Sequence, residues 1–91
     1  MTPKFLLGKV IATPGSLQAL LASGQQPAEF LARHHAGDWG DVCEEDGRQN
    51  DEAILDGSRI LSAYRLANDQ KLWIITEADR SSTCLLLPTE Y

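Results

Sequence analysis

Two adjacent histidines near two aspartates are the first residues of this chain whose types could do chemistry. His34 and His35 are followed by Asp38 and Asp41, and imidazole and carboxylate groups are ligands that Zn²⁺ and Fe²⁺ accept. Neighbouring side chains on a helix point about 100° apart, however, so the two rings cannot easily bind one ion. Histidines are also favoured near helix C-termini by the helix dipole. We therefore expect no metal site, and we expect the two aspartates to be turn and cap residues.

A second set of residues could support the cleavage of RNA. Arginine, glutamate and histidine side chains in one polar patch can perform general acid–base catalysis. The candidate catalytic residues are His34, His35, Arg59, Glu77 and Arg80. The alternative is a turn around Glu77 and Arg80, held by ion pairs and by serine and threonine hydrogen bonds to the backbone, and we favour this interpretation. The chain has no glycine-rich phosphate loop, nucleophile elbow or paired-cysteine zinc motif.

Trp39 stands among glycines and aspartates in the segment Gly37–Asp41. A tryptophan in a loop either fills the core or anchors a partner. We expect Trp39 to be largely buried, so that it locks this turn over a sheet. The candidate binding residues, from this turn and from the polar segment 76–83, are Trp39, Asp38, Asp41, Asp79 and Arg80.

The composition is that of one ordinary globular domain with a negative charge. The 91 residues are 43% hydrophobic and 23% charged, with a formal net charge of −5 and a pI of about 4.8. Proteins that bind nucleic acids concentrate lysine and arginine, so direct nucleic-acid binding is not expected. Apolar runs are too short for a membrane span and a secretion signal is missing. We expect a cytoplasmic protein without cofactors, with Cys43 and Cys84 as reduced thiols.

The scaffold that must position these residues lies between Arg59 and Leu87. Three runs rich in β-branched, aromatic and aliphatic residues are separated by turn-forming residues, which is typical of an antiparallel meander. We expect Asn68-Asp69 to be a two-residue turn. The resulting cross-strand pairs are Leu66–Lys71, Tyr64–Trp73, Ser62–Ile75 and Ile60–Glu77, with Arg59 opposite Ala78. Both faces of this sheet are mostly apolar, so one layer of helices leaves the other face to be covered.

The N-terminal half of the chain predicts one strand and three helices. The predicted elements are a strand over residues 4–12 and helices that begin at Pro14, Pro27 and Val42 and end near Gly24, His35 and Leu55. Asp41 and Glu44 have the spacing of a capping box for the third helix, and Gly57 is its C-cap. The predicted fold is one α+β domain over residues 1–91: an N-terminal strand, three helices, then a three-stranded antiparallel meander.

Several segments resemble a family of small bacterial proteins. They are Ala12-Thr13-Pro14-Gly15, the run 34–41, Glu45-Asp46, Asn50 and the run 75–81, of which HHAGDWGD and ITEADRS are the most distinctive. The members are labelled plasmid-related proteins, and some labels tie them to type I restriction systems. The resemblance covers nearly the whole chain. It implies a setting on mobile elements in the bacterial cytoplasm, with an accessory or anti-defence role and no catalytic residues to carry over.

Three functions compete on the sequence. The leading one is a small non-enzymatic binding or accessory protein of a bacterial mobile element, with a protein partner and an anti-defence role as one form of it. The alternative is a metal-independent ribonuclease of the small barnase/RelE-like class. The third is an acidic protein that occludes the nucleic-acid-binding groove of a defence enzyme, with the carboxylates Glu44, Glu45, Asp46, Asp51, Glu52 and Asp56 as its surface.

We also expect a homodimer. With both sheet faces apolar, the strand Thr83–Leu87 or the face with Tyr64 and Trp73 should require protection, which a two-fold dimer supplies most simply. The alternative is that the N-terminal strand, residues 4–12, pairs at the sheet edge while the C-terminal tail folds across the open face.

Overall fold

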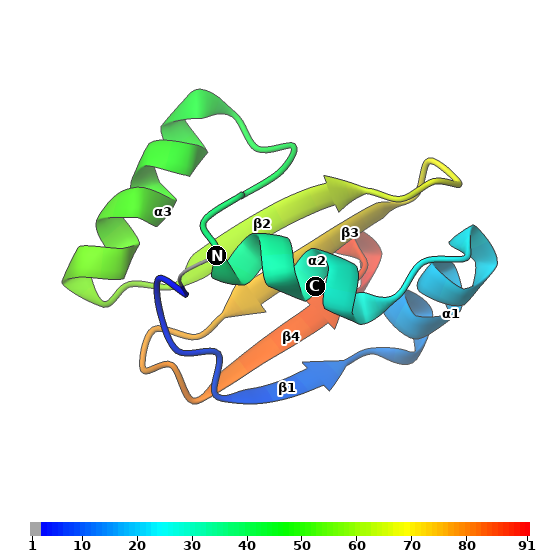
Figure 1. Ribbon diagram of the computed structural model, residues 1–91, viewed down its shortest axis with the longest axis horizontal. Helices are drawn as coiled ribbons and strands as arrows, with labels where there is room; N and C mark the ends of the chain where they lie inside the picture. Colours follow the sequence, from blue (N-terminus) through cyan, green and yellow to red (C-terminus); the bar gives the residue numbers. More distant parts are fainter. Residues whose placement is uncertain (1–2) are drawn as a thin grey trace.

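The element order of the chain follows the prediction. The computed structural model describes residues 3–91 (Figure 1). Its elements are β1 (Lys9–Ala12), α1 (Pro14–Ser23), α2 (Pro27–His35), α3 (Glu44–Asp56), β2 (Ile60–Arg65), β3 (Lys71–Thr76), β4 (Ser82–Leu86) and the 3-10 helix η1 (Pro88–Glu90). The predicted order of one strand, three helices and three strands is confirmed. Within the described residues, no helix has the length and apolar character that crossing a membrane requires.

The sheet has four strands and is mixed, so the prediction of a three-stranded antiparallel meander is wrong. The strand order is β1-β4-β3-β2, with β1 parallel to β4 and the other neighbours antiparallel. The N-terminal strand joins the sheet beside β4 (Figure 1). Parallel strands require a long connection, and here all three helices and two strands lie between β1 and β4 in the chain. As a result β4 is an inner strand, not an edge.

The loop between β2 and β3 is one residue longer than predicted. The Leu66 N–H donates to the Gln70 carbonyl (2.8 Å), and the Asp69 N–H donates to the Leu66 carbonyl (2.9 Å). Asp69 has the left-handed conformation, with φ 73°. Three-residue hairpin loops commonly end on such a left-handed residue. The loop is therefore Ala67–Asp69 rather than a two-residue turn.

This extra loop residue moves the predicted β2–β3 register by one position. Tyr64 pairs with Leu72, and Trp73 pairs with Ala63, so the predicted Tyr64–Trp73 pair is wrong. Because successive side chains in a strand point to opposite faces, a slip of one residue exchanges the faces of a whole strand. Tyr64 and Trp73 consequently lie on opposite faces of the sheet.

One face of the sheet packs against α1 and α2 and forms the main core. Every second strand residue points to this face, and these residues are at most 2% exposed: Ile60, Ser62, Tyr64, Leu66, Leu72, Ile74, Thr76, Thr83 and Leu85. Leu20 of α1 and Phe30 of α2 pack into the same cluster. In Figure 1, α2 crosses in front of the sheet and α3 lies beside β2. The helices therefore cover one face and leave the other without a helical layer.

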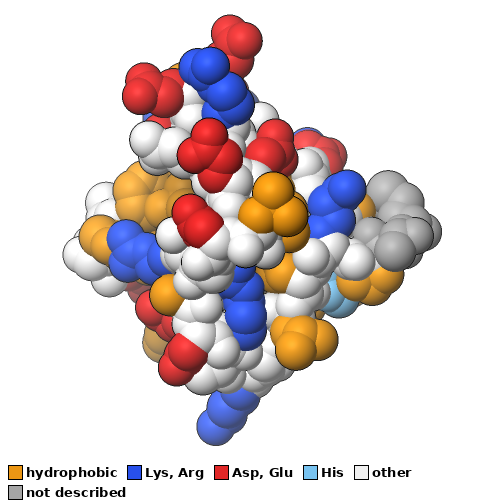
Figure 2. Space-filling view, turned by 90° about the vertical axis from the view of Figure 1, so that its left-hand side faces the viewer, with side chains coloured by type: hydrophobic (Ala, Val, Ile, Leu, Met, Phe, Trp, Pro, Cys, Tyr) orange, Lys and Arg blue, Asp and Glu red, His pale blue; other side chains and the backbone are white. Residues whose placement is uncertain are grey.

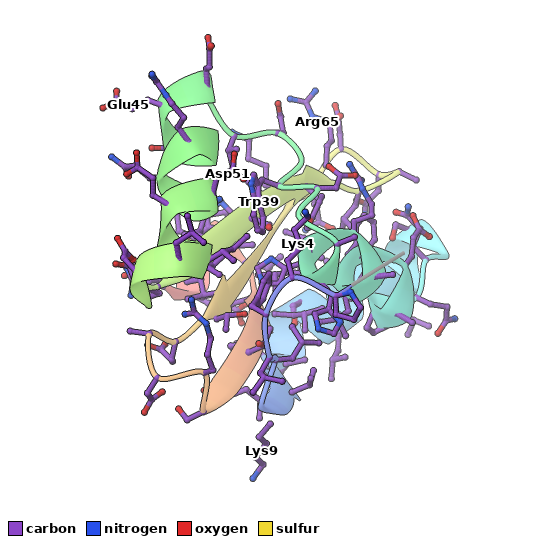
Figure 3. The ribbon with its side chains drawn as sticks, turned by 60° about the vertical axis from the view of Figure 1, so that its left-hand side comes forward. Lys4, Lys9, Trp39, Glu45, Asp51 and Arg65 are labelled. Atoms are coloured by element: carbon purple, nitrogen blue, oxygen red, sulfur yellow. The ribbon has the colours of Figure 1, made fainter. Side chains whose placement is uncertain are left out.

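Trp39 fills a second, smaller core next to α3, as predicted. It is 7% exposed and clusters with Ala53 and Ile60. Its indole N–H donates to Asp51 Oδ1 at 3.0 Å, and Figure 3 shows the two side chains between α3 and the sheet. The Ala63 N–H donates to the Trp39 carbonyl (3.1 Å). The loop around Trp39 is thereby fixed to β2.

The third helix begins two residues later than predicted. Its N-cap is Cys43, which makes no side-chain capping hydrogen bond, so the predicted Asp41–Glu44 capping box is wrong. The Asp41 N–H instead donates to the Ala63 carbonyl (2.5 Å), which holds Asp41 against β2. Gly57 ends the helix in the left-handed conformation (φ 79°), as predicted.

Candidate functional site

His34 lies in the core, with both ring nitrogens occupied. Its exposure is 0%. Nδ1 lies 2.5 Å from Ser62 Oγ, and Nε2 lies 2.9 Å from Thr76 Oγ1. Burial lowers the pKa of His34 to about 3, with a smaller contribution from the neighbouring His35. At neutral pH the ring is therefore uncharged.

The hydroxyl groups around His34 form a chain whose direction can be assigned. The Thr83 hydroxyl donates to the Leu7 carbonyl (2.7 Å), so its oxygen must accept from Thr76, which lies 2.7 Å away. Thr76 then accepts from the Nε2–H of His34, and Nδ1 accepts from Ser62. Every donor and acceptor is used, which is what a buried polar network requires. The network ties α2 to three strand residues and to the segment before β1, and it leaves His34 no contact with solvent.

His35 serves a different segment from His34. Its Nε2–H donates to the Phe5 carbonyl (2.7 Å), and its own carbonyl accepts from the Lys4 N–H (3.0 Å). The Phe5 ring packs edge-on against both histidine rings, with centroids 5.2 and 5.7 Å away. The histidine pair therefore holds the N-terminal segment to α2, and its two rings bind different groups.

Arg80 binds the end of α3. Its guanidinium donates to the Ala53 carbonyl (2.8 Å) and to the Ser58 carbonyl (2.6 Å), and it also reaches the carbonyls of its own loop. The Ala53 carbonyl also accepts from the Gly57 N–H (2.9 Å), and a cation beside a helix C-terminus complements the helix dipole. Arg80 is thus engaged in holding the β3–β4 loop to α3.

The remaining candidate catalytic residues lie on the other side of the sheet from His34. Ile60 pairs with Thr76, so the register places Arg59 opposite Glu77 rather than opposite Ala78 as predicted. Both residues are exposed, and the Arg59 guanidinium lies 5.5 Å from the centre of the Tyr91 ring. The structure therefore brings Arg59 and Glu77 together but does not join them to either histidine.

Asp38 and Asp41 stabilise the loop before α3. Asp38 Oδ2 forms an ion pair with Arg33 (2.7 Å), and its Oδ1 accepts from the Gly40 N–H (3.1 Å). The hydrogen bond from Arg33 lowers the pKa of Asp38. The Asp41 carboxylate lies 3.8 Å from the Arg65 guanidinium. These contacts are those of a turn residue, as expected for Asp38, whereas the expected cap role of Asp41 is wrong because Cys43 is the N-cap of α3.

Asp79 lies in a different loop from the other candidate binding residues. Its Oδ1 accepts from the Ser81 N–H (3.0 Å), and the hydrogen bonds from Ser81 lower its pKa. Asp38 and Asp41 belong to the loop after α2, whereas Trp39 between them is buried. The five candidate binding residues therefore do not form one exposed cluster.

The sheet face opposite the helices carries an apolar strip that the sequence prediction did not define. We call it the far face. The strand register places two rows of side chains on it: Ile11, Cys84, Ile75 and Leu61 in one, and Leu86, Trp73 and Ala63 in the other. Trp73 is half-buried and Ile11 is 43% exposed. With the correct loop length, the alternation along β2 and β3 would have revealed this strip.

The C-terminal tail covers only part of the far face. The Tyr91 ring lies 5.8 Å from the Trp73 ring, edge to face, while Tyr91 itself is 67% exposed. Ile75 and Leu86 are 5% and 6% exposed. Together with the pairing of β1, this tail matches the arrangement that we set out as the alternative to a dimer built on β4 or on a Tyr64–Trp73 face.

Basic residues border the far face. Register and strand alternation place exposed Lys9, Arg59, Arg65 and Lys71 on it. Among strand and strand-flanking positions of this face, Glu77 is the acidic one, and Arg65 is ion-paired with Asp41 and Asp69. The far face therefore has an apolar centre bordered by basic side chains, of which Arg65 is already paired, although the chain as a whole is acidic.

Negative charge gathers instead on α3. The first turn of this helix carries Glu44, Glu45 and Asp46, and Figure 2 shows acidic side chains collected at the top of the molecule, over this helix. Carboxylates at a helix N-terminus are favoured by the helix dipole. One carboxylate of the acidic set, Asp51, is already bound to Trp39. This surface is accordingly described well as a solvated helix face.

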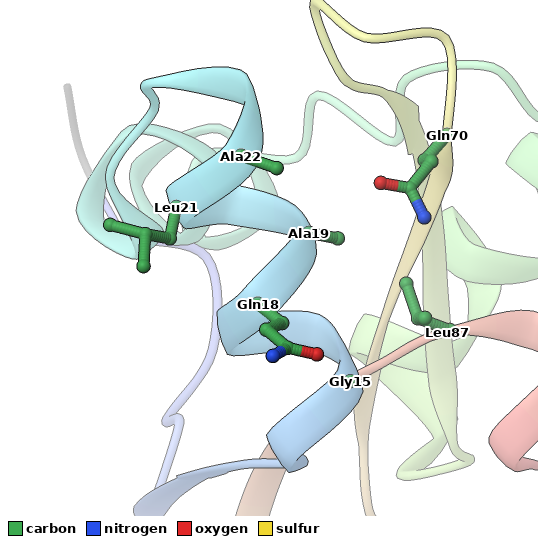
Figure 4. A pocket seen from close by; sticks show the side chains of 7 residues that line it. All are labelled: Gly15, Gln18, Ala19, Leu21, Ala22, Gln70 and Leu87. Atoms are coloured by element: carbon green, nitrogen blue, oxygen red, sulfur yellow. The ribbon is translucent and has the colours of Figure 1, made fainter.

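A hollow of about 460 Å³ lies beside α1 (Figure 4). Its lining residues are Gly15, Gln18, Ala19, Leu21, Ala22, Gln70 and Leu87. None of them carries a titratable side chain, and only the two glutamines offer polar side chains. This hollow therefore supplies no acid, base or nucleophile.

Comparison with known proteins finds no relative of this chain. No protein-family model, no curated protein and no solved structure matches the chain. A function has to be inferred from the geometry above.

Proposed function

We propose that this chain is a small non-enzymatic binding protein that holds a protein partner on the far face of its sheet. The observation that carries the proposal is the apolar strip with Trp73 at its centre, on a face that α1, α2 and α3 leave uncovered and that the C-terminal tail covers only in part. Exposed apolar patches rimmed by polar residues mark interaction sites. Tryptophan and arginine supply much of the binding energy at such sites.

The positions of the candidate catalytic residues support binding over RNA cleavage. A general acid or base must come within hydrogen-bonding reach of its substrate. His34 is 0% exposed and has both ring nitrogens bound. Arg80 donates to the Ala53 and Ser58 carbonyls rather than facing solvent. His35 donates from Nε2 to the Phe5 carbonyl, so the residues left for a ribonuclease, Arg59 and Glu77, include no histidine.

The charge of the far face indicates the chemistry of the partner. Its rim carries the cations Lys9, Arg59, Arg65 and Lys71. Complementary charge across an interface speeds encounter and selects the partner. The partner that fits is a protein with an apolar patch bordered by acidic side chains. The resemblance to plasmid-related proteins supports a cytoplasmic, accessory or anti-defence setting for this interaction.

The test compares two single substitutions of exposed apolar side chains. Trp73→Ala alters the far face, and Leu21→Ala, at a residue of α1 that is 80% exposed, is the matched control. Each tagged protein captures partners from isotopically labelled host lysate, and circular dichroism checks that the fold is retained.

We expect the wild type and Leu21→Ala to retain the same partner protein in equal amounts, and Trp73→Ala to lose most of it. Equal capture by Trp73→Ala would contradict the proposal. So would tight binding of single-stranded RNA or DNA to the far face, or cleavage of RNA by the purified wild type.

A further inference from the structure

The two edge strands of the sheet differ in whether their outward backbone groups are hydrogen-bonded, and those of β2 are. The Asn50 side chain donates from Nδ2 to the Leu61 carbonyl (2.7 Å) and accepts from the Leu61 N–H at Oδ1 (3.1 Å). Two residues further along, Ala63 exchanges hydrogen bonds with the backbone of Trp39 and Asp41. A side-chain amide and a short loop segment thus occupy the groups with which another strand would pair.

The β1 edge, in contrast, is open. The Lys9 N–H donates to the Ser81 carbonyl (3.0 Å) and the Thr13 N–H donates to the Leu85 carbonyl (2.9 Å). Alternate residues of a strand bond to the same neighbour, so the N–H and C=O groups of Val10 and Ala12 point away from β4. β1 is the outermost strand in Figure 1, and within residues 3–91 no element lies beyond it.

Apolar side chains accompany these free backbone groups. Leu6 is 74% exposed, Val10 44% and Ile11 43%. An edge strand with free backbone groups and apolar side chains is a template for pairing, and proteins usually block it. Lys9 is the one charged residue of β1, and Figure 3 shows its side chain projecting away from the molecule.

We propose that β1 pairs with β1 of a second copy of the chain, antiparallel and about a two-fold axis at Ile11. In this register Ile11 lies opposite its own copy, and Val10 lies opposite Ala12 of the other copy. Each Val10–Ala12 pair exchanges two N–H···O=C bonds, as directly opposed residues do in an antiparallel ladder. A two-fold contact uses the same patch on both subunits, so all the outward groups of Val10 and Ala12 are satisfied together.

Charge complementarity supports this register. Lys9 of one copy lies opposite Thr13 of the other. The Thr13 hydroxyl donates to Glu90 Oε1, so a carboxylate is fixed beside that position. The next residue, Pro14, begins α1 and has no N–H, which ends the ladder where the helix starts. The same pairing therefore brings the Lys9 ammonium of each copy close to the Glu90 carboxylate of the other copy.

Pairing at β1 also joins the two far faces. Ile11 belongs to the far face and lies at the proposed two-fold axis. The two four-stranded sheets would form one continuous sheet, and the apolar strips of the two copies would meet at this axis. This inference does not rest on the proposed function. A chain that dimerises through β1 need not bind another protein, and a monomer could still do so.

The experiment measures molecular mass by light scattering and sedimentation over a wide concentration range. Val10→Pro removes the outward N–H of residue 10 and no hydrogen bond to β4. Val10→Thr keeps that N–H and serves as the control. A second measurement uses the wild type alone: amide hydrogen exchange of Val10 and Ala12 in dilute and in concentrated solution.

We expect a reversible dimer for the wild type and for Val10→Thr. Val10→Pro removes one donor from each subunit, which should weaken the dimer about 30-fold. The amides of Val10 and Ala12 should exchange slowly only in concentrated solution. A wild type that is monomeric at the highest concentration would overturn the inference, as would a Val10→Pro dimer of unchanged affinity. If Val10→Pro fails to fold, rapid exchange of both amides at every concentration would overturn it equally.

Discussion

Replacement of Trp39 by alanine should remove a large part of the stability of this fold. The side chain is 7% exposed and packs between α3 and the sheet, so nearly all of the indole is lost from the core. Truncation of a buried tryptophan to alanine costs about 3–5 kcal/mol. A domain of this size has a total stability of about 5–15 kcal/mol, so the free energy of unfolding should fall by about a fifth or more.

A matched variant separates the packing of Trp39 from its hydrogen bond. Trp39→Phe keeps an aromatic ring but cannot donate to Asp51, which lies 3.0 Å from the indole nitrogen. A typical net contribution of such a bond is about 1 kcal/mol. We therefore expect Trp39→Phe to lose far less stability than Trp39→Ala.

Urea unfolding and thermal unfolding, both followed by far-ultraviolet circular dichroism, measure both variants in dilute solution. For Trp39→Ala we expect a thermal midpoint lowered by at least about 12 °C, since 1 kcal/mol corresponds to about 4–8 °C in a domain of this length. An unfolding midpoint equal to that of the wild type would refute the core role of Trp39. The residue would then have to be reassigned to partner binding.

Three further predictions concern the buried His34, the contact of Arg80 with the end of α3, and the β2 edge that Asn50 covers. The pKa of His34 is about 3 in the folded protein and about 6.5 in the unfolded chain, so on acidification the unfolded state binds a proton that the folded state does not. Urea titrations between pH 7 and 5 should therefore show that the free energy of unfolding falls below about pH 6.5, by up to 1.4 kcal/mol per pH unit. His34→Gln should lack this pH dependence. Arg80→Lys should cost about 1–2 kcal/mol, because an ammonium cannot reach the carbonyls of Ala53 and Ser58 together, and amide exchange at the end of α3 should accelerate. Asn50→Leu should cost about 1–3 kcal/mol by leaving the Leu61 backbone unpaired and should increase aggregation on heating, measured by light scattering.

Local signals in the sequence predicted the elements well. Thr13 caps α1 and accepts from the Ser16 N–H, as its residue type and the following proline indicate. Gly8 lies inside the predicted strand 4–12, where a glycine indicates a bulge or a close approach of the backbone, and a Cβ built on it would lie 2.4 Å from the Arg80 carbonyl oxygen. Such features depend on a few neighbouring residues, so they can be inferred from the chain alone.

Long-range pairing could not be inferred in the same way. Nothing in residues 4–12 specifies a neighbour more than seventy positions away, as in the pairing of Val10 with Thr83. The β2–β3 register failed for a smaller reason: Asn68 and Asp69 both suit a tight turn, and the sequence does not show that Asp69 takes the left-handed conformation as a third loop residue. That one residue decided which face Trp73 occupies.

The candidate catalytic site failed because burial is not a local property. His34 binds Ser62 and Thr76, which lie 28 and 42 positions away, and a histidine near a helix end looks the same in the sequence whether it faces solvent or the core. In the sequence, Arg80 looks like an exposed loop arginine, and only the structure shows that α3 lies beside it and accepts its hydrogen bond. The preference for a structural turn around Glu77 and Arg80 was recovered from residue types, but Arg80 hydrogen bonds to carbonyls and the Asp79 carboxylate hold this turn, rather than the expected ion pairs and serine and threonine hydrogen bonds.

The most direct test of the far face as a binding surface is a cross-linking experiment in the native host. Tyr91→p-benzoylphenylalanine keeps an aromatic ring beside Trp73, and the same photoreactive residue at Leu21, on the exposed side of α1, is the control. On irradiation we expect position 91 to cross-link to a single partner protein and position 21 to leave that partner free. Cross-links from position 21 alone, or from position 91 only to nucleic acid, would contradict a protein-binding far face.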